Sequence, residues 1–276
     1  MRPAMCLPFG VLVCSLEAAR QRLHPRAPSS AVLFFGGSFS PMQRSHVAAG
    51  HLAKNAVESS PLNIRVDSVR FSPVGDAYGK KGLWPASDRL PLGNMLLEEE
   101  NISGLVMDAW ESEQPTYQET YKVVQRMVDV HKHKNGADLV MMLGGADLFE
   151  GMFFAEPTPK IPYIWSKESV AQLMELLDGI VIIQRPGSET WDAEDIRRRL
   201  KATLAGSSFD VSNLDEAVII VAEESAGDGS STEVRALIGS GLASQTDRTR
   251  LVELLGPAMT REITSRLEYF RGLVMQ

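Results

Sequence analysis

Six short and mostly apolar segments recur along the chain, and a longer stretch separates each one from the next. In the longer stretches apolar residues return every three or four positions, as they do on one face of a helix. Nearly continuous apolar strands are typical of a parallel sheet that helices cover on both faces. The pattern therefore predicts one α/β domain with a doubly wound parallel sheet and a helical C-terminal end. The strands are expected at Ala31–Phe35, Ile64–Phe71, Leu105–Asp108, Asp138–Leu143, Gly179–Gln184 and Ala217–Ala222.

Helices are expected in the stretches between these strands. Serine favours helix N-caps because its hydroxyl accepts hydrogen bonds from free backbone N–H groups. The expected helices begin at Ser45 and Ser166 and cover Asp88–Glu100, Thr116–Lys134, Asp192–Leu204 and Leu251–Phe270, the last as one or two helices. Ligands of doubly wound folds bind beyond the carboxyl ends of the strands, where the strand order reverses, so functional residues are expected in the loops that follow strands.

Composition and charge exclude several classes of function. The chain has 276 residues and a formal net charge of -7, so no basic surface for coating nucleic acid is expected. Both cysteines, Cys6 and Cys14, lie in the first segment, which excludes a disulfide framework and a zinc site built on cysteines in the rest of the chain. No apolar run reaches the roughly 18–20 residues of a membrane-spanning helix. Monomeric and homo-oligomeric states both stay open.

Residues 1–30 form an N-terminal extension, and residues 31–276 form the predicted domain. The extension contains a short apolar stretch and several arginines, and Glu17 is its single acidic residue. This composition is compatible with a targeting segment, which would favour mitochondria. The alternative is a helix over Val11–Leu23 that packs on the edge of the domain, in a protein of the cytoplasm or nucleus.

The most informative short motif is Gly36-Gly-Ser-Phe-Ser-Pro-Met-Gln-Arg-Ser-His46, between the first expected strand and the first expected helix. Glycines at such a turn let the backbone approach a phosphate, and the free N–H groups of a helix N-terminus carry partial positive charge. His46 lies in the first helical turn and can present a ring nitrogen to the same anion. The plainer alternative is a tight turn with an incidental histidine.

A second motif, Gly229-Ser-Ser-Thr-Glu-Val-Arg235, follows the last expected strand. Its hydroxyl residues can cap a helix and donate to phosphate oxygens, and Arg235 follows about one turn later with a planar fork of donors. Alone, this motif is also compatible with a capped surface helix. Two such helix N-termini after different strands predict a nucleoside triphosphate that is held from two sides.

Further candidates lie in other loops that follow strands. Lys80 and Lys81 stand on a glycine-bracketed loop, where cations can neutralise a phosphate during transfer, although paired lysines are usually only exposed. Trp110 and Trp165 can stack against a flat heteroaromatic ring such as a pyridinium, although loop tryptophans are more often packing residues. Asp147 can accept hydrogen bonds from ribose hydroxyls, or it can be a helix cap.

The order of these motifs resembles that in the eukaryotic nicotinamide/nicotinate mononucleotide adenylyltransferases of the nucleotidylyltransferase superfamily. The resemblance covers roughly residues 31–270 and is most specific at Ser72-Pro-Val-Gly-Asp-Ala-Tyr78 and Trp110-Glu-Ser112. It implies a Rossmann-like nucleotidylyltransferase fold and adenylyl transfer from ATP to either mononucleotide, which forms NAD or its deamido form plus pyrophosphate. It also implies Mg²⁺ or another divalent cation carried with ATP, and no metal site built from side chains.

The resemblance assigns roles to individual residues. His46, Lys80 and Arg235 would be catalytic. The ATP-binding residues would be Gly37, Ser38, Phe39, His46, Gly145, Asp147, Ser231, Thr232 and Arg235. The mononucleotide-binding residues would be Ser38, Phe39, Lys80, Trp110, Trp165 and Arg185.

Four positions depart from the family pattern. The family has asparagine in place of Ser40, threonine or histidine in place of Gln43, a hydrophobic residue in place of Gly229 and a basic residue in place of Ala236. Ser40 and Gln43 keep hydrogen-bonding side chains, so ATP binding stays compatible with them. Two alternatives remain: a nucleotidylyltransferase with another phosphorylated acceptor, and a diverged nucleotide-binding protein without catalysis.

Overall fold

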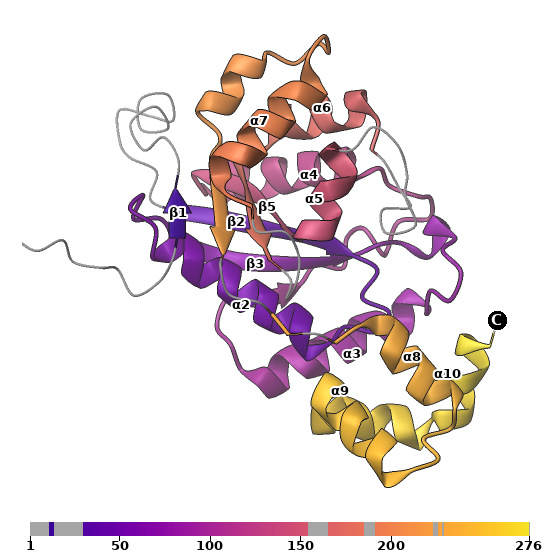
Figure 1. The fold of residues 1–276 in the computed structure, drawn as a ribbon. Coiled ribbons are helices and arrows are strands. Elements are labelled where there is room, and N and C mark those ends of the chain that lie inside the picture. The colour runs from indigo at the N-terminus through magenta and orange to yellow at the C-terminus, as the bar shows by residue number, and fades with distance from the viewer. Residues whose placement is uncertain are drawn as a thin grey trace, which may run out of the picture.

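In the computed structural model, seven strands of the described residues form one sheet in the order β1-β7-β6-β5-β2-β3-β4 (Figure 1). The described residues are 11–13, 30–153, 165–184, 191–222, 226–227 and 229–275, without the side chains of 11–13 and 153. The strands are β1 (Val11–Val13), β2 (Ser30–Gly37), β3 (Arg65–Pro73), β4 (Leu105–Met107), β5 (Leu139–Gly145), β6 (Gly179–Ile183) and β7 (Val218–Ala222). All neighbours are parallel except β1 and β7, which confirms the predicted doubly wound sheet.

The strand order reverses between β2 and β5 at the centre of the sheet. From β2 the chain proceeds through β3 and β4 toward one edge, and it then returns to β5 and continues through β6 and β7 toward the other. β2 and β5 pair directly, from Ala31 opposite Leu139 to Phe34 opposite Met142. The connections leave these two strands in opposite directions, so the space beyond their carboxyl ends is the expected ligand position.

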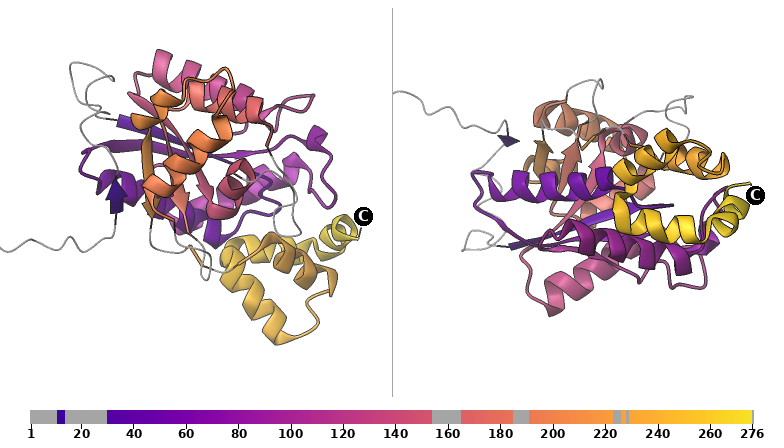
Figure 2. Two further views of the ribbon diagram at one scale, coloured as in Figure 1. Left: turned by 45° about the horizontal axis from the view of Figure 1, so that its top comes forward. Right: turned by 90° about the horizontal axis from the view of Figure 1, so that it is seen from below.

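Helices cover both faces of the sheet (Figures 1 and 2). One face carries α2 (Arg44–Glu58) and α3 (Ala86–Glu100), and α8 (Ser231–Gly239), α9 (Gln245–Ser265) and α10 (Leu267–Val274) form a group that packs on these two helices through α9. The other carries α4 (Thr120–Met127), the π-helical η2 (Val128–Lys134), α5 (Ala146–Phe153), α6 (Lys167–Leu176) and α7 (Ala193–Leu204). Alternate residues of β2 serve both cores, since Leu33 and Phe35 pack on the α2 side and Phe34 packs on the α4 side.

The C-terminal helices attach to the domain through α3. Helix α9 is kinked at Gly256, which has a φ of 77° and is followed by Pro257. A Cβ at Gly256 would lie 2.7 Å from Glu99 Oε1, while Glu99 Oε2 accepts a hydrogen bond of 2.7 Å from Ala258 N. The Glu99 carboxylate thus caps the second half of α9, and only glycine leaves room for it. No helix in the described ranges has both the length and the apolar character needed to cross a membrane.

The structure corrects three expected elements. Residues 11–13 form a strand that pairs with β7 instead of the start of a helix, and the rest of the expected segment, 14–23, lies outside the described residues. The first domain helix begins at Arg44, because the Gln43 carbonyl already accepts from His46 N at 3.0 Å. The expected helix Thr116–Lys134 begins only at Thr120, because Glu119 has an extended backbone, and it continues as a π-helix from Val128.

Two short 3-10 helices complete the described elements. η1 (Asp76–Tyr78) follows β3 in the Ser-Pro-Val-Gly-Asp-Ala-Tyr run, and η3 (Val211–Asp215) precedes β7. Ser166 and Asp192 cap α6 and α7 through side-chain oxygens that accept from Ser169 N and Asp195 N. The cap predicted at Ser166 is therefore confirmed.

Candidate functional site

The end of β2 and the turn after it lie at the reversal point of the sheet, and two glycines begin this segment. A Cβ at Gly36 would lie 2.8 Å from the Phe34 ring, and a Cβ at Gly37 would lie 3.0 Å from the Phe39 ring. Phe39 itself is buried, with a left-handed φ of 43°, and its ring packs on Phe35 at 5.6 Å between centroids. Phe39 is therefore a buried anchor of this turn, in which residues 36–38 are half-buried.

His46 stands in the first turn of α2 with a fixed ring orientation. Its Nδ1 accepts a hydrogen bond of 3.1 Å from the Gln43 backbone N–H, and its ring packs against Phe39 at 5.1 Å between centroids. Because Nδ1 is the acceptor, the neutral ring carries its proton on Nε2. In the neutral form the half-buried imidazole of His46 therefore has its N–H at Nε2 and not at Nδ1.

The N-terminus of α8 is joined to the N-terminus of α2 by side-chain hydrogen bonds. Gln43 Nε2 donates to Ser231 Oγ at 2.9 Å, and Ser231 Oγ donates to the Pro41 carbonyl at 3.1 Å. Arg235 Nη1 donates to the Ser40 carbonyl at 2.8 Å, and its Nη2 lies 3.3 Å from Thr232 Oγ1. Free N–H groups of two helices and one guanidinium therefore surround the same turn.

The lysine loop docks onto this turn through Ser40. Its hydroxyl accepts from Trp84 N at 2.8 Å and lies 3.4 Å from the Gly82 carbonyl. Lys80 Nζ donates to Ser38 Oγ at 3.3 Å. Partial burial lowers the pKa of Lys80, and the nearby positive charge of Arg235 lowers it further. The cations of two separate motifs are thus close enough to act on one anion.

Arg89 is the residue that sequence reasoning missed behind this turn. Its guanidinium is fully buried and donates to the carbonyls of Ser38 at 3.0 Å, Val74 at 2.7 Å and Trp84 at 2.6 Å. It also donates to Asp76 Oδ1 at 3.0 Å. Burial lowers the pKa of Arg89, and the bond to Asp76 opposes that shift. In the sequence Arg89 is an ordinary residue of an expected helix. The acidic Asp76 in the preceding loop is the one sequence signal that could have suggested an ion pair with it.

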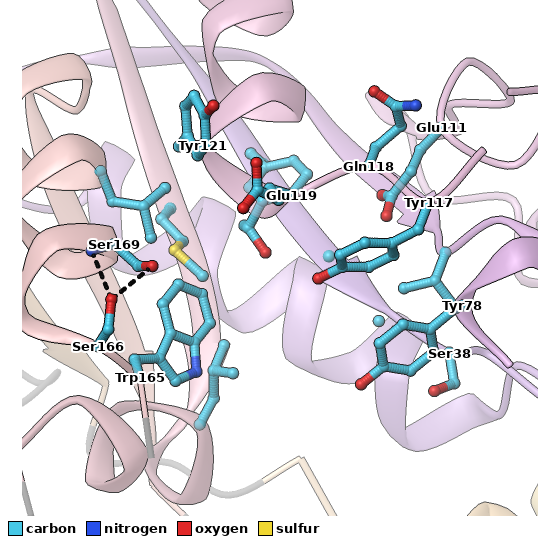
Figure 3. Close-up of a pocket in the computed structure, with 18 residues that line it drawn as sticks. Ser38, Tyr78, Glu111, Tyr117, Gln118, Glu119, Tyr121, Trp165, Ser166 and Ser169 are labelled. Atoms are coloured by element: carbon cyan, nitrogen blue, oxygen red, sulfur yellow. Dashed lines mark hydrogen bonds between the residues drawn. The ribbon is translucent and has the colours of Figure 1, made fainter. Parts of the chain in front are cut away.

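A cavity of about 450 Å³ opens beside the turn, on the α4 side of β2 (Figure 3). Residues 36–38 form part of its wall, Trp165 stands on one side, and Tyr78 and Tyr117 stand on the opposite side. The two tyrosine rings are stacked, with centroids 5.6 Å apart and an interplanar angle of 27°. Flat aromatic walls of this kind suit a planar ring as ligand.

Trp110 is not among the residues that line this cavity. The Arg126 guanidinium lies 5.6 Å from the centroid of its ring, and Arg126 in turn bonds Asp108 at 2.7 Å. Of the two tryptophans expected as walls, only Trp165 lines this cavity, and Tyr78 and Tyr117 stand opposite it. Tyr117 lies in the same loop as Trp110, and the sequence signal that could have identified it is simply a second aromatic residue there.

Glu111 brings a buried carboxyl group to the cavity. It accepts a hydrogen bond of 2.8 Å from Ser72 Oγ and is 5% exposed. Burial raises the pKa of Glu111 to about 7, against the effects of the Ser72 bond and of Arg89. This carboxyl group therefore changes its charge near neutral pH.

The remaining predicted residues lie along the same edge of the sheet, except for one that lies outside the described residues. Gly145 ends β5 opposite Ile183 of β6, and Asp147 is exposed in the first turn of α5. Leu148, the next residue of α5, lines the cavity, so this turn borders it. Lys81 is exposed on the loop beyond Lys80. Arg185 lies outside the described residues.

The fold and the joined helix N-termini define an α/β protein of the Rossmann-like class, in which anionic ligands bind at helix N-termini. The chain is 31% identical over 170 residues to the nicotinamide/nicotinic acid mononucleotide adenylyltransferase of Schizosaccharomyces pombe, which covers 58% of this chain and 44% of that protein. It is 32% identical over 162 residues to the protein of that name from Arabidopsis thaliana, covering 57% of this chain and 63% of that protein. The chain thus spans about half the length of these relatives, and the resemblance predicted from its motifs is confirmed.

The solved structures show the same fold. The nicotinic acid mononucleotide adenylyltransferase of Plasmodium falciparum, complexed with NaAD, superposes with a TM-score of 0.57 at 14% identity, over 87% of this chain and 97% of that one. This similarity confirms the Rossmann-like fold with its helical C-terminal end. No protein-family model matches the chain.

Proposed function

We propose that the chain transfers the AMP group of ATP to the phosphate of nicotinamide or nicotinate mononucleotide. The observation that carries the proposal is the position of residues 36–38. Toward α2, residues 39–43 connect this turn to the helix N-terminus that Gln43 joins to α8, and residues 36–38 themselves form a wall of the aromatic cavity. A turn between an anion-binding region and a flat pocket can hold two nucleotides against each other. The names of the relatives support the choice of substrates.

The triphosphate would lie at the two helix N-termini. His46 would donate through Nε2, and Arg235 and Lys80 would neutralise charge that develops on the phosphates. The groups that converge there are cationic or N–H donors, which favour anions over metal ions. ATP would therefore bring its Mg²⁺ as a complex, with the cation on the phosphate oxygens. Gly145 and Asp147 would lie toward the adenosine.

The mononucleotide would place its pyridine ring in the aromatic cavity. Trp165 on one side and Tyr117 on the other can stack with a cationic pyridinium ring. Lys80, which bonds Ser38 at the cavity wall, would then be placed to meet the phosphate of the mononucleotide. The positive charges of Lys80 and Arg235 would reduce the repulsion between the negatively charged acceptor and the triphosphate as the two approach each other.

The reaction needs no side chain as nucleophile. A mononucleotide phosphate is already anionic at neutral pH, and one of its oxygens would attack the α-phosphorus of ATP. The bond from the α-phosphorus to the bridging oxygen breaks, and pyrophosphate leaves with that electron pair. The protein aligns the two phosphates and stabilises the charge that moves to the leaving group.

A direct assay tests the proposal. Purified chain with ATP, Mg²⁺ and either mononucleotide should form the dinucleotide and pyrophosphate in equal amounts, and chelation of Mg²⁺ should stop the reaction. A parallel reaction with other phosphorylated acceptors should give no product. Product from those acceptors alone would favour the other nucleotidylyltransferase, and ATP binding without pyrophosphate release would favour the non-catalytic alternative.

A further inference from the structure

Gln43 connects the two helix N-termini that the proposed function assigns to the triphosphate. We propose that Gln43 is a positioning residue that sets the spacing between α2 and α8, and that Gly229 is the partner it requires. The inference rests on the proposed function for the identity of the ligand. Gln43 and Gly229 are two of the four positions that depart from the pattern of the resembled family.

The hydrogen bonds of Gln43 have fixed directions. Its side chain is fully buried, and Nε2 donates to Ser231 Oγ at 2.9 Å. Ser231 uses its own proton toward the Pro41 carbonyl at 3.1 Å, so its oxygen needs a donor from Gln43. If the Gln43 amide group rotated by 180°, the Ser231 hydroxyl oxygen would lose its hydrogen-bond donor.

Gly229 makes room for this amide. A Cβ at position 229 would lie 2.9 Å from Gln43 Oε1 and 2.7 Å from Leu254 Cδ2, both closer than side-chain atoms tolerate. The Leu254 methyl group ends a flexible side chain and can rotate away. The Gln43 amide is buried and bonded at Nε2, so any side chain at 229 would have to displace it. The long amide at 43 and the missing side chain at 229 therefore depend on each other.

The same residue holds groups on both sides of the anion site. The Gln43 backbone N–H donates to His46 Nδ1 and so orients the imidazole ring. The Gln43 side chain donates to Ser231 in the first turn of α8. Arg235 lies about one turn further along α8 and contacts the Ser40 carbonyl. A shift of α8 relative to α2 would therefore change the distance between the guanidinium and the imidazole. Alignment of the triphosphate depends on that distance.

Steady-state kinetics of four variants test the inference. Gln43→Met keeps the length of the side chain without its hydrogen bond, and we expect kcat/KM for ATP to fall about tenfold, mainly in kcat, as for the loss of one buried hydrogen bond. The KM for the mononucleotide should stay within twofold. Gly229→Ala should cause a similar fall, and Gln43→Ala/Gly229→Ala should be no worse than Gln43→Ala alone.

Matched controls separate this effect from general damage. Gln125→Ala removes an exposed side chain whose amide donates to Asp129 Oδ1, and Gly272→Ala adds a Cβ where no atom of the described residues lies within 4 Å. Both should keep wild-type kinetics. Losses that multiply in Gln43→Ala/Gly229→Ala, or a Gln43→Met variant within twofold of wild type, would overturn the inference. If Gly229→Ala does not fold, Gln43→Met and Ser231→Ala are compared singly and together. We then expect the loss of kcat/KM in the double variant to be smaller than the product of the two single losses.

Calorimetric measurement of the Kd for ATP keeps the two proposals apart. If the wild-type chain forms no dinucleotide but the four variants show the same coupling in the Kd for ATP, the proposed function fails and the positioning role stands. If the wild-type chain forms the dinucleotide and the losses are independent, the positioning role fails alone. A wild-type chain that neither binds ATP nor forms the product would overturn both.

Discussion

Replacement of Arg89 by methionine tests how the turn at Ser38 is held from behind. Methionine fills much of the apolar volume but leaves the carbonyl groups of Ser38, Val74 and Trp84 without their donor. A buried polar group without a partner costs about 1–3 kcal/mol. Removal of the desolvation cost of the buried cation offsets part of this loss. Asp76 is exposed and recovers water as its partner, so we expect the free energy of unfolding to fall by about 3 kcal/mol.

Urea denaturation followed by far-UV circular dichroism measures this loss. Arg65→Met is the matched control, because Arg65 is exposed on β3 and pairs with Asp67, and its removal should cost less than about 1 kcal/mol. Arg89→Met should also lose dinucleotide formation, because the Ser38 carbonyl is no longer held. An unfolding free energy for Arg89→Met within about 1 kcal/mol of wild type would refute the role of the buried guanidinium.

Three further predictions concern the charge and the walls of the site. Ionisation of Glu111, with a pKa raised from 4.5 to about 7, should destabilise the fold as pH rises through that range. Glu111→Gln should therefore remove about 2–3 kcal/mol of the difference in unfolding free energy between pH 5 and pH 8, and an unchanged difference would contradict the burial argument. Tyr117→Ala should raise the KM for the mononucleotide about tenfold and Trp110→Ala should raise it less, whereas the reverse order in kinetics would restore Trp110 as the wall. His46→Ala should lower kcat by about 100-fold or more with little change in circular dichroism, and near-normal turnover would reject its role.

The sequence predicts the sheet well because its signal is local. Apolar runs such as 31–35 carry their own strand pattern, and six predicted strands are present in the parallel sheet. The two helix N-termini were also expected, because glycines and hydroxyl residues mark such turns directly. Their meeting through Gln43 and Ser231 depends on contacts between distant parts of the chain, which no local pattern records.

The same limit explains the aromatic walls and the buried arginine. Trp110 and Tyr117 stand in one loop, and only the folded path of that loop decides which ring faces the cavity. Arg89 has the pattern of a surface residue on a helix, yet three carbonyl groups from two loops converge on it. Ser40 and Gly229 gain their meaning only from their neighbours across the fold.

The lysine loop is supported by helix α10. Trp84, which directly follows the Lys80 loop, is fully buried against Phe270 of α10 with ring centroids 4.7 Å apart. A ribosome adds Phe270 after the sheet and both helix N-termini, because all of these precede it along the chain. During synthesis the sheet can therefore assemble before the loop acquires its support, and the acceptor side of the site matures only when α10 has emerged.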